Sequence, residues 1–149
     1  MEAVIFVGLQ ATGKSTFYRE RFYRTHVRIS LDLMKTRHRE KRFLEVCIET
    51  GQRFAVDNTN PSAAERAVYI LAAKAASYRV VCYFFESKIE DCKRRNAARA
   101  ADEQIPVVGL MGTRSRLELP KRSEGYDEMW FVRIAEEGGF AVAEWTDEV

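Results

Sequence analysis

The sequence predicts an α/β protein in which helices cover both faces of a mostly parallel sheet. Short apolar segments rich in β-branched residues alternate with helical patterns, and the first segment, residues 3–7, runs into a glycine loop. Strands buried on both faces read as continuous apolar runs, and strands that alternate with helices favour a parallel sheet between helical layers. We therefore expect one domain over residues 1–149, a three-layer α/β/α sandwich with about five strands.

The first half of the chain contains three strands of this expected sheet. Residues 3–7 form the first, and residues 14–24 read as a helix with apolar side chains spaced by three and four. The expected elements that follow are a strand at 26–29, a helix at 32–50 ended by Gly51, a strand at 53–56, and a helix from Pro61 to about residue 77, capped by Asn60.

The second half supplies the longest apolar run, residues 79–85, which is the expected central strand. Ser87 is the expected cap of a helix at 88–99, and the polar stretch 100–104 leads to Pro106 and another short helix. Residues 128–134 read as a further strand, and residues 140–145 add an edge strand after a Gly-Gly turn.

The composition is that of a globular protein without a strong overall charge. The chain is 46% hydrophobic and 31% charged, with a formal net charge of +2. Binding to a polyanion would therefore depend on a local basic patch. Cys47, Cys82 and Cys92 suit neither a disulfide framework nor a zinc site. With no signal or membrane-spanning pattern either, we expect a cytoplasmic protein that does not bind membranes.

The glycine loop is the strongest functional signal. Residues 8–15, GLQATGKS, match the eight-position P-loop pattern in full, between a buried strand and an amphipathic helix. Its backbone N–H groups cradle phosphates, Lys14 reaches the β- and γ-phosphates, and Ser15 offers a hydroxyl to Mg²⁺, with Thr16 in support. The pattern predicts a P-loop NTPase fold of the nucleotide-kinase type that binds ATP and Mg²⁺.

Phosphoryl transfer also needs an aligned acceptor and charge stabilisation, and these groups are expected at the carboxyl ends of the strands. Asp32, just after the second strand, could accept the acceptor's proton or merely cap a helix. Asp57 and Asn58 close the third strand, where an acid beside a P-loop often holds Mg²⁺; a turn or cap role is the alternative.

Two basic clusters have both a functional and a structural interpretation. Arg95 and Arg99, which share a helical face, could close over the triphosphate as a lid or form a solvated helix end with Arg94. The second cluster could grip a phosphate backbone or face solvent. Its members are Lys35, Arg37, His38, Arg39, Lys41 and Arg42.

Several of these features occur in an order that resembles the kinase domain of polynucleotide 5′-hydroxyl kinases, like that of polynucleotide kinase/phosphatase. The segments that carry the resemblance are residues 8–16, 27–32, VDNTNP at 56–61, Arg95-Asn96 with Arg99, IPV at 105–107, and EGYDE at 124–128. They span nearly the whole chain, and the resemblance also implies a helical lid. In contrast to many members, Ser30-Leu31 stands where the family often has Asn-Arg.

The resemblance implies a role for each matching residue. Asp32 would be the general base, and Lys14 and Arg99 would act on the transferring phosphoryl group. Lys35 would contact the phosphate next to the acceptor nucleoside, although lysine lacks the bidentate fork of arginine. Asp57 and Asn58 would bind substrate, and Ser15 and Asp57 the metal. The implied ATP-binding set is Gly8, Ala11, Thr12, Gly13, Lys14, Ser15, Thr16, Arg95 and Arg99.

The sequence therefore predicts an ATP-dependent phosphotransferase acting on the 5′-hydroxyl end of a nucleic acid, with any phosphatase or ligase partner on a separate protein. A kinase of a small-molecule hydroxyl on a sugar, nucleoside or antibiotic is the alternative, because fold and P-loop do not set the acceptor. A non-catalytic ATP-binding module is the third interpretation. DNA or RNA preference, strandedness, donor nucleobase selectivity and oligomeric state stay open.

Overall fold

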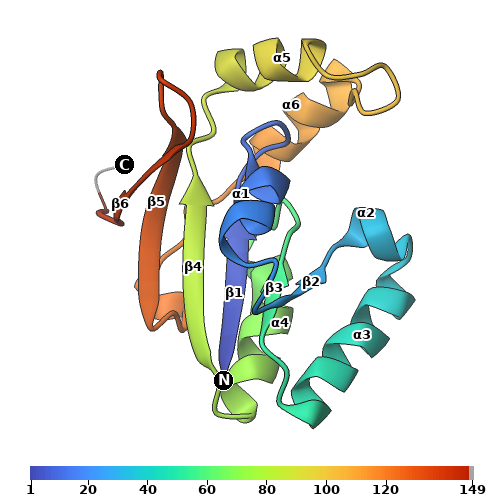
Figure 1. Ribbon diagram of the computed structural model, residues 1–149, viewed down its shortest axis with the longest axis vertical. Helices are drawn as coiled ribbons and strands as arrows, with labels where there is room; N and C mark the ends of the chain where they lie inside the picture. Colours follow the sequence, from blue (N-terminus) through green and yellow to red (C-terminus); the bar gives the residue numbers. More distant parts are fainter. Residues whose placement is uncertain (148–149) are drawn as a thin grey trace.

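The computed structural model describes residues 1–147, which form one six-stranded sheet with helices on both faces (Figure 1). The strand order is β2-β3-β1-β4-β5-β6, and all neighbouring pairs are parallel except β5 with β6. The strands are β1 (Glu2–Val7), β2 (Val27–Ile29), β3 (Phe54–Val56), β4 (Arg79–Phe85), β5 (Glu128–Ile134) and β6 (Phe140–Glu144). The predicted α/β/α fold is confirmed, and the antiparallel β6 is the expected edge strand.

Each central strand sends alternate side chains into two separate cores. On β1, Ile5 and Val7 pack in one cluster with α3 and α4, whereas Val4 and Phe6 pack in a second cluster with α1. Successive side chains of a strand point to opposite faces, so an apolar run such as that of β1 fills both layers at once. This is why the runs at 3–7 and 79–85 are continuous and not alternating.

The helices cover the faces and the carboxyl ends of the strands. They are α1 (Lys14–Arg21), α2 (Leu31–Met34), α3 (Arg37–Thr50), α4 (Ala63–Ala75), α5 (Ile89–Ala97) and α6 (Val107–Arg116), with a 3₁₀ turn at Arg122–Glu124. Figure 1 shows α1 and α4 on opposite faces, and α5 and α6 beyond the carboxyl ends of β1 and β4. Leu9, Cys92 and Leu110 form a small core that joins these two helices to the phosphate loop.

The expected single helix at 32–50 is in fact two helices. The backbone of Lys35 has a φ of 74°, which an α-helix cannot contain, and α3 starts afresh with the Thr36 hydroxyl accepting a hydrogen bond from Arg39 N. Asp32 therefore lies on a separate four-residue helix, α2. The charged composition of this region hid the break.

Two predicted helix caps were also wrong. Ser62, not Asn60, caps α4, in a reciprocal capping box with Glu65. Asn60 instead has a φ of 46°, and its Nδ2 donates to Phe6 O at 2.7 Å. Ser87 makes no cap to α5; its hydroxyl accepts from Leu9 N at 3.0 Å and so supports the phosphate loop.

Within residues 1–147, no helix is both long and apolar enough to cross a membrane. All three cysteines are buried free thiols, as expected. Trp145 is buried, whereas Trp130 is only half-buried.

Candidate active site

The phosphate loop connects β1 to α1 and can exist only because two positions are glycine. A Cβ on Gly8 would lie 3.0 Å from the Cβ of Phe85 on the neighbouring strand. Gly13 has a φ of 90°, and a Cβ there would lie 2.8 Å from the ring of Phe140. The β5–β6 hairpin therefore packs directly against the loop, so the C-terminal strands help to fix the geometry of the phosphate site.

Lys14 lies under this loop and is almost fully buried. Its Nζ donates to Gly8 O at 3.0 Å and Leu9 O at 2.6 Å, and lies 3.4 Å from the Thr12 hydroxyl. Burial lowers the pKa of Lys14 from 10.5 to about 8, against the opposing effect of the Asp57 carboxylate. An anion bound in the loop would favour the charged form of this amine.

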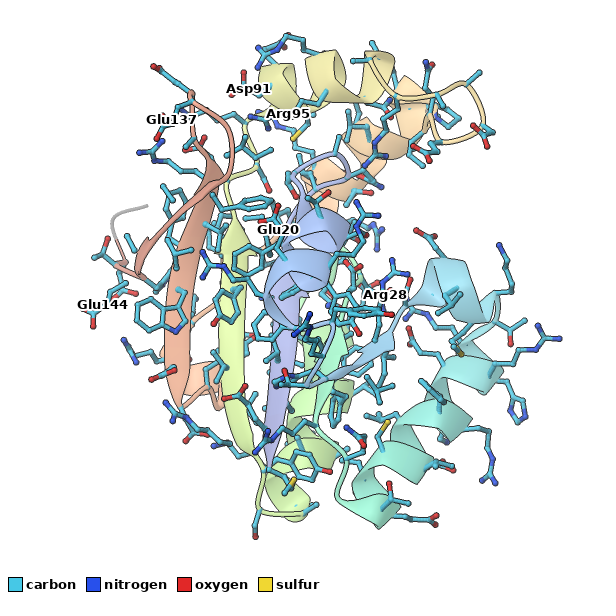
Figure 2. All side chains as sticks on the ribbon, in the orientation of Figure 1. Glu20, Arg28, Asp91, Arg95, Glu137 and Glu144 are labelled. Carbon is cyan, nitrogen blue, oxygen red and sulfur yellow. The ribbon has the colours of Figure 1, made fainter. Side chains whose placement is uncertain are left out.

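Ser15, Asp57 and Arg28 make a compact polar group at the start of α1. Ser15 Oγ donates to Asp57 Oδ2 at 2.8 Å, and Arg28 Nε donates to the same oxygen at 2.8 Å. Arg28 Nη2 also lies 3.1 Å from Ser15 Oγ. The side chain of Asp57 is 2% exposed, so this carboxylate is buried with a cation beside it. Figure 2 shows Arg28 between α1 and α2.

The oxygens of Ser15 and Asp57 fit Mg²⁺. Mg²⁺ prefers hard oxygen ligands, keeps several waters, and is usually held by one or two protein groups together with substrate phosphates. A hydroxyl and a carboxylate in contact beside a phosphate loop provide that donor set. When bound, the ion would neutralise charge on the transferring phosphates.

A cleft of about 150 Å³ brings most of the predicted site residues together. Asp32 from α2, Asp57 and Asn58 from the end of β3, and Arg99 from beyond α5 all line it. From the phosphate loop and the start of α1 the lining includes Gln10, Ala11, Gly13, Lys14, Ser15 and Thr16. Asp32 is exposed to solvent, and Lys14 lies at the buried end of the same cleft.

Four of the predicted residues do not line this cleft. Gly8 and Thr12 lie in the loop's own framework, where Thr12 Oγ1 donates to Leu9 O at 2.8 Å. Arg95 is half-buried; burial raises the pKa of the Cys92 thiol, and the nearby Arg95 guanidinium opposes that rise. Lys35 is exposed, at the C-terminal end of α2.

Asn58 lines the cleft but uses its amide within the protein. Its Oδ1 accepts from Leu31 N at 2.8 Å, and its Nδ2 donates to Glu40 Oε2 at 2.7 Å. Tyr69 OH lies 3.3 Å from the same Nδ2 and 2.5 Å from Glu40 Oε1. Asn58 therefore links the end of β3 to α2, α3 and α4.

Sequence reasoning missed Arg28, Glu40 and Gln10. Arg28 carried a signal, since a charged residue in a three-residue strand that leads to Asp32 is out of place in a buried sheet. Gln10 Nε2 lies 3.0 Å from Thr113 Oγ1 on α6, which ties the loop to the lid region. The contact of Gln10 with Thr113 and the contact of Glu40 with Asn58 do not follow from sequence spacing, because in each case the two residues are distant in the sequence.

Comparison with known proteins places this chain in a family. The AAA domain family matches residues 33–120, more than half of the chain. The chain belongs to the AAA domain family. The matched segment of this AAA domain includes Asp57, Asn58 and Arg99 and begins immediately after Asp32.

The AAA domain is also similar to individual proteins. The bifunctional polynucleotide phosphatase/kinase of Schizosaccharomyces pombe is 25% identical over 129 residues, which cover 84% of this chain and 32% of that protein. The chain thus spans about a third of the length of this relative.

Chaetomium thermophilum Kti12, crystallised with ADP-AlF3, has a TM-score of 0.70 at 13% identity, covering 88% of each chain. A gluconokinase from Sinorhizobium meliloti has a TM-score of 0.63 at 14% identity, covering 91% of this chain and 83% of its own. The protein is a P-loop domain of the kinase type.

Proposed function

We propose that this AAA domain transfers the γ-phosphate of ATP to the 5′-hydroxyl end of a polynucleotide. The observation that carries the proposal is the cleft, which holds Asp32 on the same surface as Lys14, Ser15, Asp57 and Arg99. All of these groups lie on helices and loops that surround one six-stranded sheet, so we take residues 1–149 to act as a single kinase domain.

Each group has a distinct task in the proposed reaction. The loop amides and Lys14 bind the β- and γ-phosphates, and Ser15 with Asp57 holds Mg²⁺. Asp32 accepts the proton of the attacking hydroxyl, because it is the carboxylate of the cleft that is exposed on the acceptor side. Arg99 is half-buried, with Glu103 O 3.5 Å away as a weak contact, so its guanidinium can turn to the phosphates.

Three observations support a polynucleotide acceptor over a small molecule. The relative from Schizosaccharomyces pombe is named for polynucleotide chemistry. Asp32 is exposed, which suits the end of a long chain better than a small substrate that a pocket would enclose. The basic cluster at the start of α3 is exposed throughout, and Lys35, Arg39 and Lys41 form no ion pair within residues 1–147, so these charges are available to a phosphate backbone beyond the acceptor end.

A transfer assay with labelled ATP tests the proposal. Single- and double-stranded DNA and RNA oligonucleotides with 5′-hydroxyl ends are offered beside a panel of sugars, nucleosides and aminoglycoside alcohols. Label on an oligonucleotide supports the proposal, and matched oligonucleotides with 5′-phosphates should stay unlabelled. Label confined to a small alcohol would establish the alternative acceptor, and ATP binding without transfer to any acceptor would indicate a regulatory module.

Variants separate the base from the phosphate site. Asp32→Asn should lower transfer by at least about 100-fold while changing the Kd of ATP by less than about threefold, because its carboxylate acts on the acceptor. The matched control is Asp91→Asn, since Asp91 lies outside the cleft and pairs with Arg94. Lys14→Ala should impair both ATP binding and turnover. A near-normal rate for Asp32→Asn would leave Asp32 with no role as a base.

A further inference from the structure

The helix that carries Asp32 is held in place by very few contacts. Helix α2 has four residues, and none of them is buried. Its first turn is capped weakly by Ser30, whose hydroxyl lies 3.4 Å from Leu33 N. The shorter contact is the one that Leu31 N donates to Asn58 Oδ1 at 2.8 Å. Among the hydrogen bonds of the described residues, this is the one that ties α2 to a side chain outside residues 30–35, so the position of Asp32 over the cleft depends in part on the orientation of one amide.

The orientation of the Asn58 amide is fixed by the Glu40 carboxylate, which faces the other end of that amide. A carboxylate can only accept hydrogen bonds, so the atom of Asn58 that faces Glu40 Oε2 at 2.7 Å must be the amide nitrogen. The carbonyl oxygen must then face Leu31 N, which is a donor. The charge of Glu40 thus decides which end of Asn58 points at α2.

Glu40 is itself held by donors and shielded from water. It is 4% exposed, and its Oε1 accepts from Tyr69 OH at 2.5 Å and from Arg37 Nη1 at 3.1 Å. Burial, together with the adjacent Glu40 carboxylate, raises the pKa of Tyr69, so this phenol stays a donor. Arg37 compensates the buried negative charge. Both oxygens of the Glu40 carboxylate are therefore satisfied.

We propose that Glu40 is a positioning residue for phosphoryl transfer, acting through Asn58 and Leu31 on the placement of Asp32. It does not line the cleft, which Asn58 and Asp32 do. Loss of its charge lets the Asn58 amide rotate, which removes the acceptor for Leu31 N and frees α2. This inference rests on the proposed function, because it assigns Glu40 to the acceptor side of that reaction.

The first test compares two carboxylates of α3. Glu40→Gln should lower kcat by about 10- to 100-fold, the loss expected when a catalytic group is displaced by about 1 Å, with the Kd of ATP unchanged within about threefold. Glu45→Gln is the control, since Glu45 pairs with exposed Arg42 at 2.7 Å. Tyr69→Phe removes one donor to Glu40 but leaves Asn58 engaged, so its loss should be smaller.

A double variant distinguishes positioning from general destabilisation. Asn58→Asp places a carboxylate against Glu40, and the two repel. Adding Glu40→Gln restores a donor opposite an acceptor, because the amide nitrogen of the introduced glutamine can face one oxygen of the new carboxylate while the other oxygen of that carboxylate still accepts from Leu31 N. The double variant should recover at least about tenfold in kcat over Asn58→Asp alone, which independent effects cannot produce.

Hydrogen exchange at the Leu31 amide measures the same network and needs no phosphoryl-acceptor substrate. Its protection should fall in Glu40→Gln and Asn58→Asp, return in the double variant, and stay unchanged in Glu45→Gln. If the wild-type protein labels no oligonucleotide, the proposed function fails while this exchange pattern still tests the network. The inference would be overturned if Glu40→Gln and Glu45→Gln had the same kcat and the same Leu31 protection. It would also be overturned if the double variant had no higher kcat than Asn58→Asp.

Discussion

The buried amine of Lys14 makes nucleotide binding dependent on pH in a way that can be calculated. The fall of its pKa from 10.5 to about 8 corresponds to about 3.5 kcal/mol, at about 1.4 kcal/mol per pH unit. Phosphates in the loop favour the ammonium and raise the pKa again. Below pH 8 the amine is already charged and ATP binding should not depend on its titration. Above pH 8 the Kd of ATP should rise about tenfold per pH unit until the pKa of the bound state is reached.

The same shift has a defined sign for protein stability. A lysine whose folded pKa lies below its unfolded value binds fewer protons when folded, so its contribution to the free energy of unfolding increases with pH. That increase should fall between pH 8 and 10.5 for Lys14. Binding and stability therefore move in opposite directions with pH over this range.

Isothermal titration calorimetry in buffers of different ionisation enthalpy measures the predicted proton. At pH 9, above the free-state pKa of about 8, most of one proton should be taken up per ATP, and at pH 7 much less. The terminal phosphate has lost its last proton well below pH 9, so the uptake would belong to the protein. Lys14→Arg cannot deprotonate and is the control. An absence of uptake at pH 9 would refute the assigned environment of Lys14.

Three further predictions concern the phosphate loop, a buried ion pair and the proposed metal site. Gly13→Ala should destabilise the protein by about 1–3 kcal/mol more than Gly138→Ala in urea unfolding, because both glycines have φ near 90° but only Gly13 would meet a neighbouring ring. Arg66→Met should cost about 3–5 kcal/mol of thermal or urea stability, since this guanidinium is fully buried against a carboxylate; Arg116→Met, at an exposed pair, should cost less than about 1 kcal/mol. Arg28→Gln should lower the Mg²⁺ concentration for half-maximal ATP binding by about three- to tenfold, because it removes a cation that competes for the buried carboxylate at the end of β3; an unchanged or higher midpoint would show that Arg28 instead supports the metal site.

Local signals were enough to predict the elements that local chemistry determines. The strands β4 and β5 were predicted at their observed bounds, since a long apolar run flanked by polar residues has few other interpretations. The phosphate loop and the carboxyl ends of β2 and β3 could be brought to one edge of the sheet because parallel strands end together. Asp32, Asp57 and Arg99 line one cleft at this edge, where the carboxyl ends of the strands were expected to place them.

The rest depends on contacts that no spacing reveals. The turn at Lys35 requires a positive φ at a residue type that rarely adopts one, and the preference for Ser62 over Asn60 as a cap depends on the contact that Asn60 makes with β1. The Glu40 network joins α2, α3 and α4 through residues up to 32 positions apart. The sequence contains these residues, but the contacts between them form only in the folded protein.

The guanidinium of Arg66 also constrains how the molecule opens. It is 0% exposed, and it donates to Asn60 O, Pro61 O and Glu118 O as well as to the Glu124 carboxylate. If any one of these segments moved away, the buried Arg66 guanidinium would lose an acceptor while it remained inside the protein. The turn that follows Asp57 should therefore exchange its amides only when the whole chain unfolds, which would keep the acidic end of β3 rigid.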